Sequence, residues 1–129
     1  MQACHLTITT VAEETERTVS YEGEAEFSAL SATVQYKEDG AFVRIFVEGG
    51  AVRIERKGDY ELSLRLKEDC ACEGSIGLGG TSGEVYTRTR KLSYSIGKNS
   101  LLLSARYELL TGGEPQRIKL RLYAKANGE

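Results

Sequence analysis

Two arginines occupy positions where the neighbouring pattern would place an apolar side chain. Arg56 keeps the parity of Val52 and Ile54, and Arg44 keeps the parity of the phenylalanines two residues before and after it. Side chains two residues apart in a strand share a face, so each guanidinium enters the protein if its apolar neighbours do. A buried guanidinium needs an anionic partner, and its planar fork suits bidentate anion recognition. Arg56 and Arg44 are therefore candidate contacts for an anionic ligand; the alternatives are an internal ion pair at the barrel end or, for Arg44, an outward face.

Three tyrosines have the same kind of placement. Tyr36, Tyr94 and Tyr107 each keep the parity of apolar neighbours, so their rings are expected on the buried face of a strand. Their hydroxyls could then serve a ligand, although most such tyrosines are core residues whose hydroxyl already has a protein partner. We add all three to the two arginines as candidate ligand-binding residues.

The cysteines and the histidine form no recognisable catalytic or metal site. Cys70 and Cys72 share a face of an extended segment, but one residue separates them where a zinc knuckle usually has two. His5 is the only histidine, and as the neighbour of Cys4 it points to the opposite face of a strand. A hydrogen-bonded nucleophile and base are therefore not indicated. We expect no enzyme, no catalytic residues, no metal and no cofactor, and three free thiols.

The acidic and glycine-rich segments are expected to have structural roles and no catalytic or phosphate-binding role. Glu22, Glu24 and Glu26 recur at every second residue, which could form a paired-acid glycosidase site but is expected to be a solvated strand face. The segment 74–83 is rich in glycine but lacks the Gly-Lys-Ser/Thr ending of a phosphate-binding loop, and no helical pattern follows it. We interpret this segment as a flexible connection.

The elements that must position these residues are strands. From Glu38 onward a turn signal recurs about every ten residues, and apolar and polar side chains alternate between the turns. Positive φ angles are expected at Asp39-Gly40, Gly49-Gly50, Gly58-Asp59, Gly97-Lys98-Asn99 and Gly112-Gly113. The expected strands are Cys4–Val11, Thr15–Phe27, Ser31–Lys37, Ala41–Glu48, Ala51–Lys57, Tyr60–Lys67, Glu84–Ile96, Leu101–Leu110 and Gln116–Lys125, and residues 70–78 could add a short one.

The segment 101–110 is ambiguous between strand and helix. It contains good helix formers, but its apolar residues keep one parity and a glycine turn lies on each side, which favours a strand. A sheet of eight or more twisted strands tends to close, because closure removes the unpaired edges. The sequence therefore predicts an all-β fold, an antiparallel up-and-down β-barrel, as one domain over residues 1–129.

Composition excludes a membrane-spanning helix and a disulfide framework. No run approaches the ~18 apolar residues that a membrane span needs, and the first residues lack the basic and apolar segments of a secretory signal. Three cysteines are an odd number, which agrees with a reducing compartment. We expect a cytoplasmic protein with no membrane contact.

Charge is distributed unevenly along the chain. Residues 1–84 hold 16 acidic and 8 basic side chains, whereas residues 85–129 hold 3 acidic and 9 basic ones. Opposite charges on paired strands are a common device of sheets, so we expect a late basic strand to lie beside an early acidic one. The chosen partners are the strand with Arg117, Lys119 and Arg121 and the strand with Glu22, Glu24 and Glu26. The alternative is a basic face for nucleic acid, formed by Arg88, Arg90, Lys91, Arg117, Lys119 and Arg121.

Four loose motifs carry a resemblance to a known family. In order they are Tyr36-Lys-Glu, Val52-x-Ile54-x-Arg56-x-Gly58, Gly83-x-Val85-x-Thr87-x-Thr89-x-x-Leu92 and Leu103-x-x-x-Tyr107-x-Leu109. Over residues 4 to 125 the chain resembles the YwiB-like bacterial proteins, which are calycin-like, lipocalin-type barrels. The resemblance implies a closed or nearly closed barrel able to hold a small ligand, and it brings no established activity or catalytic residues. The chain departs from the family in the segment 74–83, where the family tends to have an aromatic-containing turn.

These observations predict a non-enzymatic barrel that binds a small, partly apolar or anionic molecule through Arg56, Arg44, Tyr36, Tyr94 and Tyr107. A second hypothesis is a protein-interaction module with a filled core, forming a homodimer or binding a partner through the face that carries Phe42, Arg44 and Phe46. The third is weak binding of nucleic acid by the basic C-terminal strands. Nucleic acid is the least expected of these partners.

Overall fold

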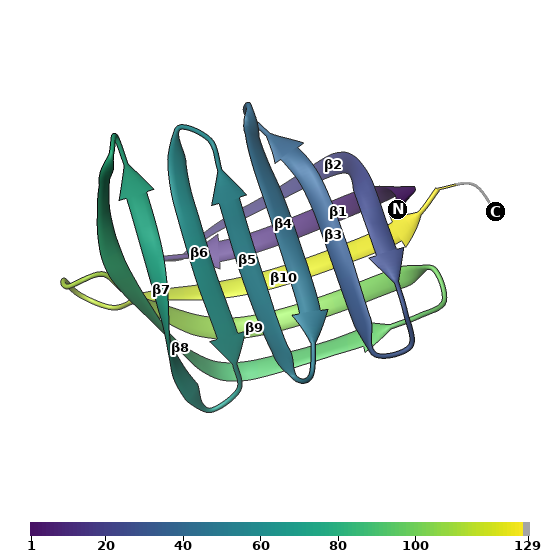
Figure 1. Ribbon diagram of the computed structural model, residues 1–129. Coiled ribbons are helices and arrows are strands. Elements are labelled where there is room, and N and C mark those ends of the chain that lie inside the picture. Colours follow the sequence, from purple (N-terminus) through teal and green to yellow (C-terminus); the bar gives the residue numbers. More distant parts are fainter. Residues whose placement is uncertain (128–129) are drawn as a thin grey trace.

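The computed structural model describes residues 1–127, and none of these residues lies in a helix. Ten antiparallel strands form a closed barrel in which each strand pairs with its neighbours in sequence and β1 also pairs with β10 (Figure 1). The predicted all-β, antiparallel up-and-down barrel is confirmed. No helix that could cross a membrane is present in the described part of the chain. The strands are β1 (Gln2–Ala12), β2 (Thr15–Phe27), β3 (Ser31–Glu38), β4 (Ala41–Glu48), β5 (Ala51–Lys57), β6 (Tyr60–Lys67), β7 (Cys70–Leu78), β8 (Thr81–Ile96), β9 (Ser100–Leu110) and β10 (Gln116–Ala126).

The tight turns follow the sequence with three exceptions. Asp39 and Gly40 have positive φ angles of 46° and 82°, as a two-residue hairpin with the twist of its strands requires. No residue of Gly58-Asp59 or of Gly97-Lys98-Asn99 has a positive φ angle, and Gly113 lacks one too, so this part of the prediction is wrong. Gly58 is needed for space instead, because a Cβ there would lie 2.6 Å from the Cβ of Ala41.

Two uncertain segments are both strands. Residues 101–110 lie in β9, as the parity of their apolar side chains predicted. The glycine-rich segment 74–83 lies in β7 and β8 except for the turn between them, so its interpretation as a flexible connection is wrong. Close packing explains one of its glycines, because a Cβ on Gly74 would lie 2.3 Å from the carbonyl oxygen of Ser63 on β6.

The barrel is flattened into two layers. In Figure 1 the strands β3 to β7 cross in front of β1, β8, β9 and β10 at a steep angle. The long strands β2 and β8 connect the layers, since β2 pairs with β1 and β3 while β8 pairs with β7 and β9. A register shift between Thr89 and Lys91 places a bulge in β8, which changes the inward parity from odd residues such as Val85 to even ones such as Leu92.

The two ends of the barrel differ in how they are filled. The end with the hairpins β2–β3, β4–β5, β6–β7 and β8–β9, here named the closed end, is packed with side chains that are almost fully buried. The other five hairpins form the open end. Close packing of the closed end leaves the open end as the place where a ligand could enter. The largest residues of the closed end are Leu6, Leu66, Leu101, Leu103 and Leu122.

The predicted pairing of the acidic and basic strands is wrong. Strand β10, with Arg117, Lys119 and Arg121, pairs with β9 and β1, while the acidic β2 pairs with β1 and β3. In a closed up-and-down barrel the first strand pairs with the last, so β1 lies between β10 and β2. The outward residues of β1 opposite Arg121 and Lys119 are Thr9 and Val11, so β1 brings no carboxylate to these two cations.

Candidate functional site

The open end holds a pocket of about 200 Å³, named here the inner pocket. Its lining residues share the inward parity of their strands and come from eight of the ten strands, so the pocket lies inside the barrel. Most of them are aliphatic, and three are tyrosines. The full lining is Ile8, Thr10, Arg17, Val19, Tyr21, Tyr36, Glu38, Ile45, Ile54, Leu62, Leu64, Tyr107 and Leu120.

Two of the predicted tyrosines, Tyr36 and Tyr107, meet at this pocket. Both residues are buried, and neither hydroxyl has a hydrogen-bond partner among the described residues. Neither hydroxyl is among the fully enclosed polar atoms that lack a partner. Burial raises the pKa of Tyr107 to about 12, and burial followed by the charge of Glu38 raises the pKa of Tyr36. Both phenols therefore remain protonated at neutral pH and are free to donate a hydrogen bond to a ligand.

Three further residues of the inner pocket were not among the predicted site residues. Tyr21 stacks on Tyr36 with ring centroids 4.6 Å apart, and its hydroxyl donates to Glu38 Oε1 at 3.0 Å. Arg17 also lines the pocket. Tyr21 and Arg17 both keep the inward parity of β2, so the sequence carried a signal for them. Glu38 is the last residue of β3, after its last apolar residue, and the sequence pattern there indicates a turn.

Arg56 points inward at the open end, as its parity predicted, but it has protein partners. Its Nη1 lies 2.9 Å from Asp59 Oδ1 and donates to the carbonyl oxygen of Tyr60 at 3.0 Å. Its Nε lies 3.6 Å from Glu38 Oε2 and is buried without a hydrogen bond. The guanidinium also lies over the ring of Tyr60, 3.8 Å from the centroid. The arrangement is the internal ion pair that the sequence left open, and ligand contact by Arg56 remains a prediction.

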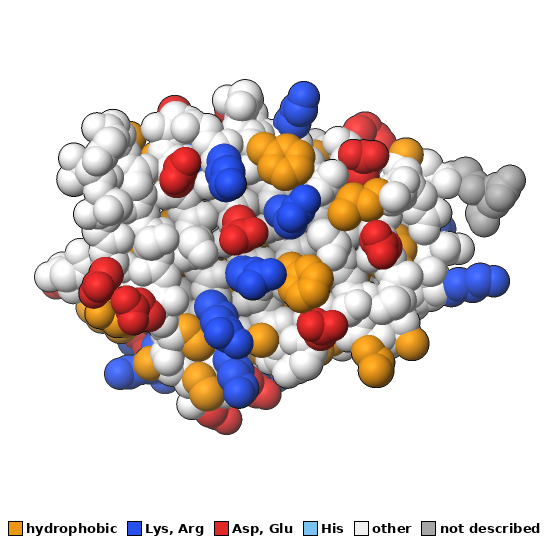
Figure 2. All heavy atoms as spheres, viewed as in Figure 1, with side chains coloured by type: hydrophobic (Ala, Val, Ile, Leu, Met, Phe, Trp, Pro, Cys, Tyr) orange, Lys and Arg blue, Asp and Glu red, His pale blue; other side chains and the backbone are white. Residues whose placement is uncertain are grey.

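Arg44 lies on the outer face of β4, so the expectation that it enters the barrel is wrong. Alternation places Ala41, Val43, Ile45 and Val47 inward, and Arg44 on the opposite side, where its Nη2 donates to Gln35 at 3.3 Å. The parity argument failed because the phenylalanines that flank Arg44 are themselves outward. Figure 2 shows basic, acidic and hydrophobic side chains interleaved over β3 to β6, so this face has no single sign of charge.

Tyr94 lies at the closed end, away from the inner pocket. Its hydroxyl accepts a hydrogen bond from the backbone N–H of Gly50 at 2.8 Å. The contact joins β8 to the β4–β5 turn, which are 44 residues apart in sequence. Tyr94 is therefore a core residue with a satisfied hydroxyl, and its grouping with the residues of the inner pocket is wrong.

The cysteines and the acidic strand form no reactive site in the structure. Cys4 is buried in the core, and Cys70 and Cys72 are half-buried free thiols on β7. Glu22 is exposed and accepts a hydrogen bond from His5 at 2.7 Å, which with Asn127 lowers the pKa of Glu22. Among residues 1–127, no three His, Cys, Asp or Glu side chains are grouped to hold a metal ion.

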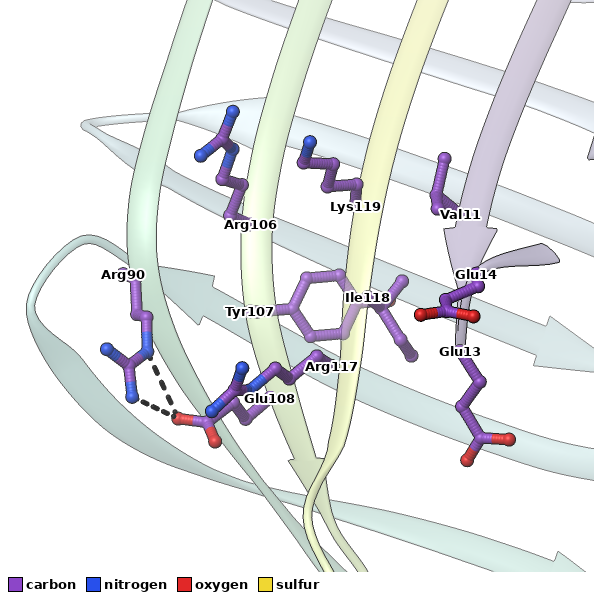
Figure 3. Close-up of a pocket in the computed structure, with 10 residues that line it drawn as sticks. All are labelled: Val11, Glu13, Glu14, Arg90, Arg106, Tyr107, Glu108, Arg117, Ile118 and Lys119. Carbon is purple, nitrogen blue, oxygen red and sulfur yellow. Dashed lines mark hydrogen bonds and ion pairs between the residues drawn. The ribbon is translucent and has the colours of Figure 1, made fainter. Parts of the chain in front are cut away.

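A second hollow, named here the outer groove, has a volume of about 560 Å³ and lies along β9 and β10 (Figure 3). Tyr107 lines both this groove and the inner pocket. Basic side chains from β8 to β10 lie on one side, and the acidic β1–β2 turn lies on the other. The lining residues are Val11, Glu13, Glu14, Arg90, Arg106, Tyr107, Glu108, Arg117, Ile118 and Lys119.

Comparison with known proteins adds a likeness of fold. No family model matches the chain, and no curated protein sequence matches it. Among solved structures, the chain is similar to the crystal structure of the ywiB protein from Bacillus subtilis, with a TM-score of 0.75 and 12% sequence identity. The match covers 98% of this chain and 91% of that one. At this identity the two chains share a barrel fold along almost their whole length, and the likeness extends no further than the fold.

Proposed function

We propose that the open end of the barrel binds a small, partly apolar molecule in the inner pocket. The observation that carries the proposal is the meeting of two protonated, unpartnered hydroxyls, those of Tyr36 and Tyr107, in an otherwise mainly aliphatic cavity. Ligand sites are typically apolar hollows with a few convergent polar groups. The other polar side chains of the lining are Thr10, Arg17, Tyr21 and Glu38, and the last two are already bonded to each other. The hydroxyls of Tyr36 and Tyr107 would therefore orient the ligand.

The size of the pocket limits the ligand. A dry cavity of roughly 150 Å³ accepts a molecule as large as benzene, so about 200 Å³ suits one six-membered ring with a short polar group. A carboxylate or hydroxyl on that ring would receive hydrogen bonds from the tyrosines. Arg17 is the cation best placed to favour an anionic group, because the charge of Arg56 is already matched by Asp59 and Glu38.

The fold supports the same class of function. Closed up-and-down barrels of the calycin type commonly hold one small ligand in the barrel mouth. Membership of the YwiB-like, calycin-like barrels is part of the proposal, and the likeness of fold and the motifs support it. A cytoplasmic location is part of the proposal and is supported by the three free thiols.

Thermal melts with single-ring probes test the proposal. Benzoate, phenol, cyclohexanecarboxylate and cyclohexanol at millimolar concentration are each added to the protein, and at least one should raise the Tm by mass action. Tyr107→Phe and Tyr36→Phe remove only a hydroxyl and should weaken the response to that probe about fivefold or more. Tyr123→Phe is the matched control, since this tyrosine is exposed on the outer face.

Methyl NMR spectra place the probe in the molecule. Shift changes should be concentrated at Ile8, Ile45 and Leu120, which line the inner pocket, and be small at Leu101 and Leu103 of the closed end. No Tm response to any probe, or shift changes spread over the outer surface, would refute the proposal.

A further inference from the structure

The outer side of strands β8, β9 and β10 is strongly basic. Seven cations lie there within three successive rows of the sheet, and each is exposed. Rows in an antiparallel sheet are about 7 Å apart along the strand, so the cations are confined to a short stretch of the barrel. This basic face consists of Arg88, Arg90, Lys91, Arg106, Arg117, Lys119 and Arg121.

The register places like charges directly opposite one another. Arg106 on β9 pairs with Lys91 on β8 and with Lys119 on β10, so three cations form one row. Like charges directly opposite on paired strands are destabilising. On β1 the next residue of the row is Val11, and a carboxylate follows only on β2, where Glu16 pairs with Val11. An anionic partner that binds this surface would offset the repulsion between the three cations and would explain why the row is present.

Glu108 is the only carboxylate that β8, β9 and β10 bring to these three rows. It is buried, lies opposite Arg88 and Arg117, and accepts two hydrogen bonds from Arg90, from Nε at 3.2 Å and from Nη2 at 3.1 Å. Arg90 is the extra residue of the β8 bulge, which brings its side chain to Glu108. One carboxylate therefore balances one cation, and six cations remain without an acidic partner on these three strands.

The outer groove gives the basic face a depth that a flat sheet lacks. Arg106, Arg117 and Lys119 line it together with the apolar Ile118 and Tyr107, while the exposed Glu13 and Glu14 of the β1–β2 turn form the opposite rim. Figure 3 shows the basic side chains on the β8, β9 and β10 side and the two glutamates on the β1 side. An anion in the groove would therefore lie against β9 and β10, away from the acidic rim.

We infer that the basic face binds single-stranded nucleic acid. Two exposed tyrosines flank the cations. Tyr123 is 43% exposed on β10, two residues from Arg121. Tyr86 is 42% exposed on β8, two residues from Arg88, and its hydroxyl donates to Glu84 at 2.8 Å. Basic surfaces that track the backbone and carry aromatic rings for base stacking are the common means of binding single strands. The two rings are the feature that favours a nucleic acid over a purely acidic polymer.

The shape of the basic face offers no element for reading the sequence of a duplex. Sequence readout of a duplex needs a helix or a ribbon that enters a groove, and the basic face is a convex sheet surface without a projecting element. Tyr107 lines both the outer groove and the inner pocket, but none of the seven cations of the basic face lines the inner pocket, so this inference does not rest on the proposed small-molecule binding.

Fluorescence anisotropy with labelled dT15 and rU15 tests the inference. Binding is expected at 25 mM NaCl and should weaken steeply with salt, with a slope of log K against log salt of about −0.7 for each phosphate contact. The double variant Arg106→Gln, Lys119→Gln should reduce the magnitude of the slope by about 1.4. The matched control, Arg53→Gln with Lys57→Gln, removes two exposed cations from β5 on the opposite layer and should leave the slope unchanged.

The stacking part has its own test. Tyr123→Ala should weaken binding of dT15 about fivefold or more at constant salt, whereas Leu78→Ala, which removes an exposed apolar side chain from β7, should have no effect. No binding of either oligonucleotide at 25 mM NaCl would overturn the inference. Competition by polyglutamate as strong as by unlabelled dT15, with no effect of Tyr123→Ala, would reduce the face to a general polyanion surface and overturn the assignment to nucleic acid.

Discussion

Arg56 and Asp59 form an ion pair with a distance of 2.9 Å between Nη1 and Oδ1, within the β5–β6 hairpin. The two residues are three apart in sequence, so the hairpin itself supplies the partner of the inward guanidinium. Tyr60 covers the guanidinium with its ring and binds it through its carbonyl oxygen. These contacts hold Arg56 at the rim of the open end, so its main role is structural.

Replacement of Arg56 should therefore destabilise the protein in the absence of any ligand. Arg56→Leu leaves the half-buried Glu38 and the exposed Asp59 without a cation and removes the packing over Tyr60. We expect the Tm to fall by about 4 °C or more. Thermal melts followed by circular dichroism measure the change.

The control for this variant is Arg44→Leu. Arg44 is outward and exposed, and its guanidinium donates a hydrogen bond of 3.3 Å to Gln35. Surface substitutions of this kind usually change stability little, so the Tm should remain within about 2 °C of the wild type. Equal Tm losses in the two variants would show that the ion pair of Arg56 contributes nothing specific.

The same ion pair makes part of the stability depend on pH. The hydrogen bond from Arg56 holds the pKa of Asp59 below its ordinary value. A carboxyl group whose folded pKa is lowered contributes stability that is present above its unfolded pKa and is lost as the pH falls through the folded one. The Tm difference between wild type and Asp59→Asn should thus be constant above about pH 5 and shrink below about pH 4. A difference that stays constant down to pH 2.5 would contradict the pairing.

Parity was sufficient to predict which side of the barrel Arg56, Tyr36 and Tyr107 face. It failed for Arg44, because the flanking phenylalanines are outward and sequence alone does not show which of two alternating faces is buried when both carry large side chains. For Tyr94, parity gave the correct face but no position along the barrel axis. The end of the barrel at which a residue lies depends on register, which pairs residues far apart in sequence.

The closure of the barrel explains what else was missed. Turn spacing and alternation predicted the strands, but β1 pairs with β10 across the whole length of the chain, and that pairing leaves no local signal. The basic face has the same origin. Arg106 joins Lys91 and Lys119 only through the register of β9 with its two neighbours, and the bulge that turns Arg90 toward Glu108 is not marked by a glycine or proline.

Close approach of strands predicts opposite effects for two glycines. A Cβ on Gly23 of β2 would lie 2.3 Å from the carbonyl oxygen of Gln35, whereas a Cβ on Gly83 of β8 meets nothing within 4 Å. Gly23→Ala must displace backbone and should cost about 2 kcal/mol or more. Gly83→Ala restricts the unfolded chain without a clash and should stabilise the fold by about 0.4–1 kcal/mol. Urea denaturation of both variants measures the two effects, and a loss of stability in Gly83→Ala equal to that of Gly23→Ala would contradict the steric argument.

Glu108 is the position at which stability and nucleic-acid binding should change in opposite directions. Glu108→Gln removes the partner of Arg90 and leaves Arg88 and Arg117 opposite a neutral side chain, so the free energy of unfolding should fall by about 1–2 kcal/mol. The same substitution removes the only carboxylate of the basic face. Affinity for labelled dT15 at low salt should therefore rise, because the face gains one net positive charge and repels the phosphates less.

The two measurements are urea denaturation and anisotropy in the same buffer. Glu61→Gln is the control, since Glu61 is exposed on β6 and changes the net charge by the same amount outside the basic face. An increase in affinity shared by both variants would mean that net charge alone is responsible. If Glu108→Gln lowers both the affinity for dT15 and the free energy of unfolding, the main role of the carboxylate would be to hold the surrounding cations in position. The expected result is a less stable protein that binds the single strand more tightly, and only the position of Glu108 among Arg88, Arg90 and Arg117 predicts that combination.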